Sequence, residues 1–464
     1  MNADRSWRMG IAIGATLIAF VSARPYAGSW NDGSRLATVE SLVERRTMII
    51  DESIFVVPIP VGQPTPYHPD DPFFHGAGTK DKLFIHGHYY SDKSPVPAFQ
   101  LAAIYAAYRW LGGPPAAERP DWFCQLMTWT ASGIAYAVAC LCIFAIGRRC
   151  RLSPRQAGWL TIFFGLGTTA LPYVQHVNNH ILLLAVAAGL FLQLVIGDAE
   201  GWSLPRLLTA GTLAGIAYTI DLGAGPPLAL LTLAYLGWRT RSLRCVGAVL
   251  AALPWIAWHH IVNYDIGGTI GPANAVRAYL DWPSSPFTDK NITGGWAHPD
   301  PFKAIVYAFD MLLGKKGFYG HNLPLFLVVL SMPMLVRTKY PERCVTLLGV
   351  IWGIGVWLLY AATSTNMSGG CCSIRWFVPL LAPSFLAVAI VVREQPRRWR
   401  ELTILGCGGL LLGIGMAIRG PWFLKLMPFY VIIYPATVVS WLMVRFHKSA
   451  TRSINIDPTP TNNG

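Results

Sequence analysis

Charged residues are scarce in this chain of 464 residues. Only 13% of its residues are Asp, Glu, Lys or Arg, whereas 53% are hydrophobic, and its mean hydropathy is +0.40. This composition excludes an ordinary soluble domain and is typical of a protein that crosses a membrane many times.

The chain also lacks the motifs of nucleotide and metal sites. No GxGxxG or P-loop sequence follows a predicted strand, and no pair among the nine Cys has the Cys-x2-Cys spacing of a zinc site. His86 and His88 provide two metal ligands without a third. In a polar loop, Cys371 and Cys372 either remain thiols or form a disulfide with each other or with Cys124. We therefore predict no metal and no cofactor.

Long apolar runs predict about twelve transmembrane helices. Their approximate limits are 9–24, 122–146, 157–173, 179–197, 205–221, 224–238, 243–262, 321–336, 343–362, 376–392, 402–418 and 422–444. The first run resembles a signal sequence, but Pro25 follows closely behind the possible cleavage site Val21-Ser22-Ala23. We expect it to remain as an uncleaved anchor.

Residues 95–112 are apolar enough to be a further span, and the positive-inside rule decides whether they cross. If they do not cross, the basic segments share the side of the N-terminus and carry the whole formal net charge of +13; these segments are 148–151, 239–241, 337–343, 393–400 and the C-terminal tail. We therefore predict cytosolic termini, with 25–121, 263–320 and 363–375 facing outward. The basic charge then reflects topology, and no nucleic acid is expected as a partner.

The segment after the first span places a carboxylate at the head of a short helix. Asp32 lies in Asn31-Asp32-Gly33-Ser34-Arg35. The helix looks amphipathic, with one apolar stripe of Leu36, Val39, Leu42 and Val43 and with Glu40, Glu44, Arg45 and Arg46 facing elsewhere. Such a helix is expected to lie on a membrane surface and to hold Asp32 at the lipid–water boundary. The alternative is that Asp32 only caps the helix.

Four outer-loop cations are candidate ligands for a phosphate. Lys93 precedes Pro95 at the start of segment 95–112, and Arg375 opens a span after a glycine-rich loop. Lys315 and Lys316, which lie before another span, are further candidates for the same role. The alternative to phosphate binding is that Lys93 only extends to the lipid head groups and that Arg375 only anchors its helix at the membrane surface. Asp221, near the outer end of the fifth span, has no partner that the sequence identifies.

Five segments, in order, resemble a known family. They are 31–37, Gly87-His88-Tyr89-Tyr90-Ser91-Asp92-Lys93-Ser94-Pro95, the basic turn 147–154, Leu312-Leu313-Gly314-Lys315-Lys316-Gly317-Phe318-Tyr319, and the stretch from Ser368-Gly369-Gly370 to Pro379. The chain resembles the GT-C-fold, polyprenyl-phosphate-sugar-dependent glycosyltransferases over residues 25–400. It looks most similar to bacterial relatives of protein O-mannosyltransferases and lipid A aminoarabinose transferases.

The resemblance implies an all-α polytopic membrane protein with juxtamembrane helices in its first outer loop. Residues 1–400, with the outer loop 25–121, would form the GT-C-like catalytic module. Further transmembrane helices would fill 401–446, and 447–464 would be a disordered cytosolic tail. The protein would be a multi-pass protein of the cell (inner) membrane with its active site on the outer, periplasmic face.

The implied reaction moves a sugar from a polyprenyl-phosphate carrier to a hydroxyl of a glycan, lipid or protein acceptor. Asp32 would be the base, and Lys93 and Arg375, with Lys315 or Lys316, would stabilise the departing lipid phosphate. His88, Tyr90, Asn179 and His180 would orient the substrates. A single displacement would invert the anomeric configuration, and no obligatory metal is implied.

The chain departs from the family pattern at two places. Lys93 is followed by Ser94-Pro95 rather than by the commoner pair of prolines. Several relatives have a second carboxylate where the third span reaches the outer face, but here the sequence is Gln175-His176-Val177-Asn178-Asn179-His180. Two other interpretations stay open: a multi-pass transporter or lipid flippase, and a membrane enzyme that transfers another group. No clear internal repeat favours a transporter.

Overall fold

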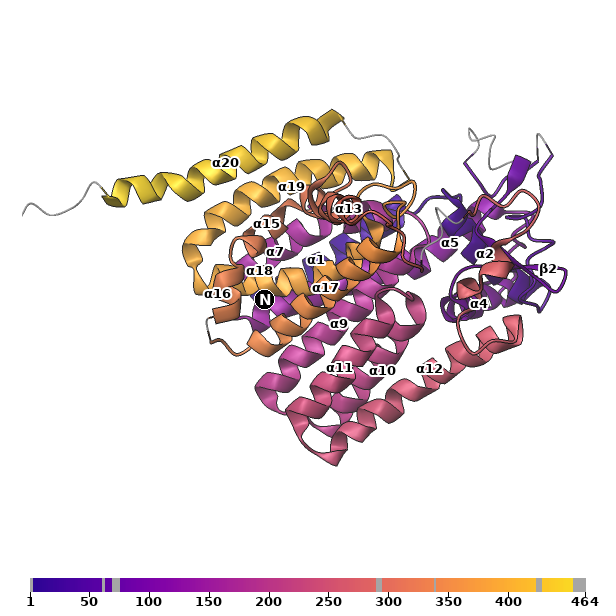
Figure 1. The fold of residues 1–464 in the computed structure, drawn as a ribbon, viewed down its shortest axis with the longest axis horizontal. Helices are drawn as coiled ribbons and strands as arrows, with labels where there is room; N and C mark the ends of the chain where they lie inside the picture. The colour runs from indigo at the N-terminus through magenta and orange to yellow at the C-terminus, as the bar shows by residue number, and fades with distance from the viewer. Residues whose placement is uncertain are drawn as a thin grey trace, which may run out of the picture.

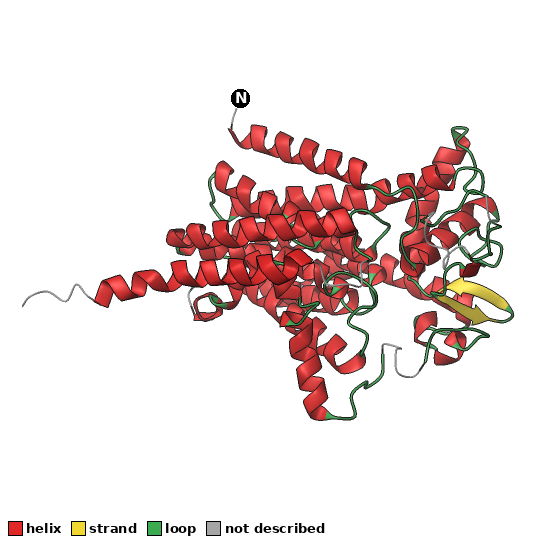
Figure 2. Ribbon diagram, turned by 90° about the horizontal axis from the view of Figure 1, so that it is seen from above, coloured by secondary structure: helices red, strands yellow, loops and turns green. Residues whose placement is uncertain are grey.

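The computed structural model describes residues 3–60, 63–68, 76–288, 294–337, 339–422 and 428–453. Long helices packed side by side form a bundle, and shorter elements gather at one end of it (Figure 1). The strands named within the described residues are β1 (Lys82–Ile85) and β2 (His88–Ser91), an antiparallel hairpin that pairs Lys82 with Ser91 and Ile85 with His88. This hairpin lies at the same end as the short elements (Figure 2).

The helices follow one another along nearly the whole described chain. They are α1 (Ala3–Ser22), α2 (Trp30–Glu44), α4 (Pro95–Trp110), α5 (Pro120–Thr128), α6 (Ile134–Arg149), α7 (Pro154–Leu166), α8 (Ala170–Tyr173), α9 (Asn179–Glu200), α10 (Leu204–Ile220), α11 (Gly225–Thr240), α12 (Val246–Gly267), α13 (Pro301–Leu313), α14 (Phe318–His321), α15 (Phe326–Val329), α16 (Met332–Arg337), α17 (Arg343–Thr363), α18 (Leu381–Glu394), α19 (Trp399–Arg419) and α20 (Pro428–Ser453).

Six described helical segments are long and apolar enough to cross a membrane. They are Pro120–Arg149, Asn179–Glu200, Leu243–Gly267, Arg343–Thr363, Arg375–Glu394 and Pro396–Arg419. The prediction of a helical membrane protein is confirmed, while the number of twelve spans stays a prediction.

One expected span is not a single helix. Residues 321–336 divide into the end of α14, a 3-10 turn, α15 and α16. Pro324 and Pro333 lie in this segment, and each lacks the amide hydrogen that a continuous helix needs. The segment is therefore broken into short helices, and its crossing of the membrane stays a prediction.

The centre of the bundle is formed by α18. Its residues from Leu381 to Val392 are buried except Ser384, which is half-buried. Helices α6, α9 and α17 pack against it, and Figure 1 shows α18 in the interior of the bundle. Because this helix meets protein on all sides, its apolar residues build the core rather than a lipid-facing surface.

Helix α2 lies inside the protein, not on a membrane surface as the amphipathic pattern suggested. Every residue from Asn31 to Ser41 is buried. Its apolar stripe packs into a cluster that includes Phe55, Tyr67, Tyr105 and Phe123. An apolar stripe fits lipid and a protein core equally well, so the pattern could not distinguish the two.

Glu40 shows why the surface assignment fails. Its side chain is buried and accepts hydrogen bonds from Arg45 and Ser53. Burial raises the pKa of Glu40, and the bonds from Arg45 and Ser53 oppose that change. The charged side of α2 is therefore covered by the chain that follows it.

Helix α4 occupies segment 95–112 and packs on α2, α10 and α12. Its C-terminal end leaves Trp110 and Leu111 exposed, at 85% and 77%. At the other end of the chain, α20 continues to Ser453, so the first part of the expected disordered tail is helical. Residues 454–464 lie outside the described residues. All nine Cys are free thiols in the structure.

Candidate functional site

Asp32 lies in the first turn of α2 and is completely buried. One carboxylate oxygen accepts a hydrogen bond from the Gly28 amide at 2.7 Å, and the other accepts one from the Ser29 hydroxyl. Ser29 is also the N-cap of the helix. The cap of α2 is thus Ser29, and Asp32 holds the segment just before the helix. Asp32 meets a further group as well, because its Oδ2 lies 3.3 Å from Nδ1 of His176.

Arg35 follows one turn later on the same face of α2. It is only 6% exposed, and its Nε has no hydrogen-bond partner among the described residues. Burial lowers the pKa of Arg35 to about 10, with Asp92 opposing this change and Arg375 adding to it. The guanidinium is therefore still charged at neutral pH, in the interior and with part of its hydrogen-bonding capacity unused.

Asp221 follows the last residue of α10 and is the most heavily bonded carboxylate here. Its Oδ2 accepts a hydrogen bond from Asn179 Nδ2 at 2.8 Å and lies 3.1 Å from His180 Nδ1. Its Oδ1 accepts bonds from the amides of Gly223 and Ala224, at 3.1 and 3.0 Å, and from the Tyr360 hydroxyl at 3.3 Å. The partner that the sequence could not identify is thus the start of α9.

Arg375 reaches this region from a tightly folded loop. Met367, Ser368 and Ser373 have positive φ angles, as does Gly369, and the Ser368 hydroxyl accepts a hydrogen bond from the Arg375 amide at 3.1 Å. The guanidinium lies 5.4 Å from the centre of the Trp422 ring. Its Nε has no hydrogen-bond partner among the described residues.

The same loop contacts Lys316, one of the two further lysines predicted as phosphate ligands. Lys316 donates a hydrogen bond to the Gly369 carbonyl at 2.5 Å. A Cβ at Gly369 would lie 3.7 Å from an Arg375 nitrogen, so the loop backbone runs beside that guanidinium. Lys316 is half-buried, whereas Lys315 is exposed.

Several residues of this region and its neighbours in sequence have buried polar atoms without a hydrogen-bond partner among the described residues. They are Asn31 Oδ1, Arg35 Nε, His176 Nδ1, Asn178 Nδ2, Asn179 Oδ1, His180 Nδ1, Ser373 Oγ, Arg375 Nε and Trp422 Nε1. Each unsatisfied buried group costs about 1–3 kcal/mol. A polar ligand at this position would supply the missing partners.

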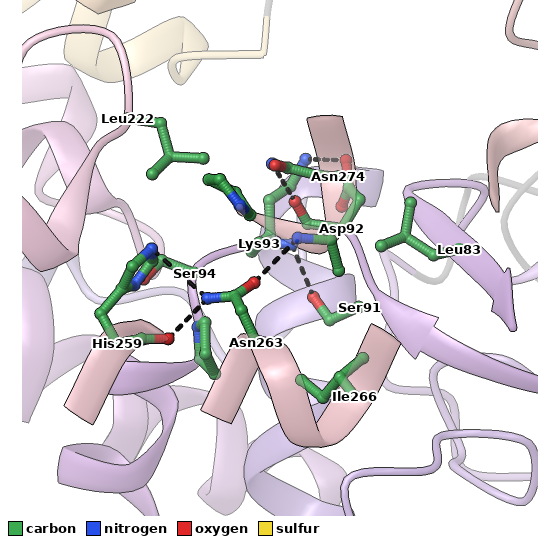
Figure 3. Close-up of a pocket in the computed structure, with 13 residues that line it drawn as sticks. Leu83, Ser91, Asp92, Lys93, Ser94, Leu222, His259, Asn263, Ile266 and Asn274 are labelled. Carbon is green, nitrogen blue, oxygen red and sulfur yellow. Dashed lines mark hydrogen bonds and ion pairs between the residues drawn. The ribbon is translucent and has the colours of Figure 1, made fainter. Parts of the chain in front are cut away.

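Lys93 is close to the site but is already neutralised. Its ammonium lies 2.7 Å from carboxylate oxygens of both Asp81 and Asp92. Burial raises the pKa of Asp92, and the charge of Lys93 opposes this. Figure 3 shows Lys93 and Asp92 beside Asn263 and His259 of α12, and these residues line one small pocket. A phosphate at Lys93 would therefore compete with two carboxylates.

Three predicted site residues are not brought together with Asp32, Arg35, Asp221 and Arg375. His88 is exposed near the turn of the hairpin, with its Nδ1 2.8 Å from Asp51. Tyr90 packs with the hairpin cluster, and its charged neighbours are Asp51 and Asp265. Lys315 projects from the end of α13 as an exposed residue. The contacts of these side chains thus give no support to a role at the candidate site.

Among the described residues, no group of three or more His, Cys, Asp and Glu side chains could hold a metal ion. The pair His86 and His88 accordingly has no third ligand in the part of the chain that the structure covers.

Sequence reasoning missed Arg35, His176 and the pairing of Asp221. Arg35 had a readable signal, since a residue three positions after Asp32 shares its helix face. His176 and the Asp221 partners had none, because each contact joins segments that only the tertiary fold brings together.

Comparison with known proteins decides the fold. No protein-family model and no curated protein sequence matches the chain. The crystal structure of ArnT from Cupriavidus metallidurans in the apo state matches 96% of this chain and 73% of its own, with a TM-score of 0.54 and 13% identity. The structure of the same protein bound to undecaprenyl phosphate matches 96% of this chain and 78% of its own, with a TM-score of 0.51 and 11% identity.

The chain has the GT-C fold. The GT-C architecture agrees with the helix-rich membrane protein that the sequence predicted. The elements of the first loop, α2, α4 and the hairpin, gather at one end of the bundle (Figure 1).

Proposed function

We propose that this protein is an integral membrane glycosyltransferase that moves a sugar from a polyprenyl-phosphate carrier to an acceptor hydroxyl. One observation carries the proposal: two arginines with unused hydrogen-bonding capacity, Arg35 and Arg375, lie within electrostatic range of each other, and Asp221 lies within range of Arg35. Two such guanidiniums suit a phosphate. The similar ArnT structure bound to undecaprenyl phosphate supports a lipid phosphate as the ligand.

Asp32 is proposed as the base, as predicted from the sequence. Its carboxylate would take the proton of the acceptor hydroxyl while that oxygen attacks the anomeric carbon. The bond from the anomeric carbon to the phosphate oxygen breaks, and its electron pair leaves with the lipid phosphate. Because this is one displacement, the anomeric configuration inverts.

Arg375 and Arg35 would stabilise the charge that develops on the departing phosphate. Lys93 is proposed to join them once the phosphate replaces one of its carboxylate partners. Lys316 lies within reach of the same loop. Asn179 and His180 keep the proposed orienting role, because both contact Asp221 within the cluster.

The proposed location is the cell (inner) membrane, with cytosolic termini and the site on the outer face. The bilayer supplies the lipid-linked donor, and the acceptor is a glycan, lipid or protein. This orientation rests on the distribution of basic residues among the loops.

A transfer assay tests the proposal. Purified protein in lipid nanodiscs is incubated with polyprenyl phosphates carrying labelled sugars, together with native membrane acceptors. We expect time-dependent transfer with at least one donor and an inverted anomeric linkage in the product. A retained configuration would contradict the single displacement, and no transfer from any donor would contradict the glycosyltransferase assignment.

A further inference from the structure

We propose that Asp221 is a positioning residue that turns Asn179 and His180 into two hydrogen-bond acceptors for hydroxyl groups of the donor sugar. This inference rests on the proposed function for the identity of its ligand. Its physical basis, the polarity of two side chains, can be measured without any transfer assay.

The argument begins with the hydrogen-bonding capacity of Asp221. Four donors bond to its two oxygens: Asn179, Tyr360 and the amides of Gly223 and Ala224. His180 Nδ1 lies 3.1 Å from Oδ2 as well. A carboxylate offers about four lone-pair sites, so none remains for a substrate proton. Asp221 therefore acts through its neighbours rather than as a base.

An ionised carboxylate only accepts hydrogen bonds, and this fixes the polarity of both neighbours. Asn179 must present its amide NH₂ to Asp221, which leaves its Oδ1 for another partner. Neutral His180 must carry its proton on Nδ1, the nitrogen that lies 3.1 Å from Asp221. Its Nε2 is then an acceptor.

Part of this hydrogen-bonding capacity has no protein partner. Asn179 Oδ1 is buried without a hydrogen bond among the described residues. His180 Nδ1 is also without a hydrogen bond of good geometry, although it lies 3.1 Å from Asp221 Oδ2. Asn179 is 6% exposed and His180 3%. A buried acceptor that lacks a donor calls for a ligand with O–H groups.

The position of these acceptors matches a sugar beside its phosphate. Arg35 and Arg375 both lie within electrostatic range of the His180 ring. Residues 179 and 180 open α9, and Asn178 caps that helix by accepting a hydrogen bond from the His180 amide at 2.8 Å. The cap holds both side chains at one helix end next to the cations. The geometry thus assigns cations to the phosphate and neutral acceptors to the sugar hydroxyls.

The first test reads the tautomer of His180. We would label the full chain in nanodiscs with ¹⁵N-histidine and identify the His180 ring signals by their loss in His180→Gln. Measured at pH 8, the wild type should show the proton on Nδ1. In Asp221→Asn the new amide can donate to Nδ1, so the proton should move to Nε2. An Nε2–H ring in the wild type would overturn the inference, whatever the transfer assay gives.

The second test compares two ligands. Asn179→Ala should bind unloaded undecaprenyl phosphate within about twofold of the wild type, because the arginines remain. Asp221→Asn should bind it at least as tightly as the wild type, because it also loses a negative charge near Arg35. Both should bind the sugar-loaded carrier that the wild type transfers about tenfold more weakly, the loss of one hydrogen bond. Asp300→Asn, an exposed helix cap on α13, is the matched charge control and should change neither affinity.

The outcomes separate the two proposals. Equal weakening of both ligands would place Asp221 in the phosphate site and overturn its role toward the sugar. Unchanged affinity for the loaded carrier in both variants would overturn it as well. Absence of transfer from every donor by the wild type would overturn the proposed function, and with it the sugar as ligand, while the tautomer measurement would still report on Asp221 and His180.

Discussion

Oδ2 of Asp32 lies 3.3 Å from Nδ1 of His176, and this contact joins the first turn of α2 to the segment before α9. The His176 ring also lies 6.3 Å from the centre of the Trp422 ring, which in turn lies under Arg375. A continuous set of contacts therefore connects the proposed base to a proposed phosphate ligand. Its geometry depends on how closely His176 can approach the backbone beside Asp32.

Gly28→Ala tests that approach. A Cβ at Gly28 would lie 2.6 Å from His176 Cε1 and 2.5 Å from Trp422 Cδ1, so both rings would have to move. We expect a loss of stability of about 1–3 kcal/mol, together with a large loss of transfer. Thermal unfolding in detergent measures the first effect. Gly271→Ala, where nothing lies within 4 Å, is the control, and equal behaviour of the two variants would contradict the packing account.

Substitutions of Arg375 and Asp92 test two cations separately: Arg375, which has unused hydrogen-bonding capacity, and Lys93, whose charge Asp81 and Asp92 neutralise. Arg375→Ala should weaken binding of undecaprenyl phosphate by at least about tenfold, the loss of a charge-assisted hydrogen bond. Asp92→Asn should strengthen binding, because Lys93 then keeps one carboxylate partner, Asp81, instead of two. Binding is measured by calorimetry in detergent, with Asp121→Asn as the charge control. Weaker binding to Asp92→Asn would contradict the competition between phosphate and carboxylate at Lys93.

Lys82 should make stability depend on alkaline pH. Burial lowers the pKa of Lys82 to about 8, with Lys80 adding to the effect, from an ordinary value of 10.5. The folded state therefore binds fewer protons than the unfolded state between these values, so this group favours folding increasingly as the pH rises from 8 to 10.5. Lys82→Met should remove that increment. Unfolding temperatures across this range test it, and parallel curves for the two proteins would contradict it.

The topology prediction has a direct check. A reporter fused near residue 115, after α4, should lie outside the cytosol, and one fused near residue 150 should lie inside. Protease protection or a periplasm-specific reporter measures this. A cytosolic reporter at 115 would reverse the side of the loops that follow and would place the site on the opposite face.

The sequence was sufficient for the class of fold, whereas the site residues that it indicated stay predictions. Apolar runs predicted a helical membrane protein, and the order of Asp32, Lys93 and Arg375 pointed to a GT-C fold. Periodicity alone could not place α2 in the interior, because Leu36 and Val39 suit lipid and protein alike. Nor could it show that Glu40 is covered by Arg45 and Ser53.

The features of the candidate site that the sequence could not predict depend on tertiary contacts. The sequence marks Asp221 as a candidate functional residue, because it is an acidic residue near the end of an apolar span. Its contacts with Asn179 and His180 form only when α9 and α10 pack together. Lys93 looked like a free cation because its partner Asp81 comes from the segment just before β1. Unused hydrogen-bonding capacity, as at Arg35 Nε, cannot be read from a sequence at all.

The most direct measurement is sugar transfer from polyprenyl-phosphate donors by the wild type and by Asp32→Asn, each purified and shown to be folded by thermal unfolding. The account predicts transfer by the wild type and a loss of at least about a hundredfold in Asp32→Asn, the range expected when a general base is removed. Equal turnover by the two proteins would contradict the account and would leave Asp32 with only its structural contacts to Gly28 and Ser29.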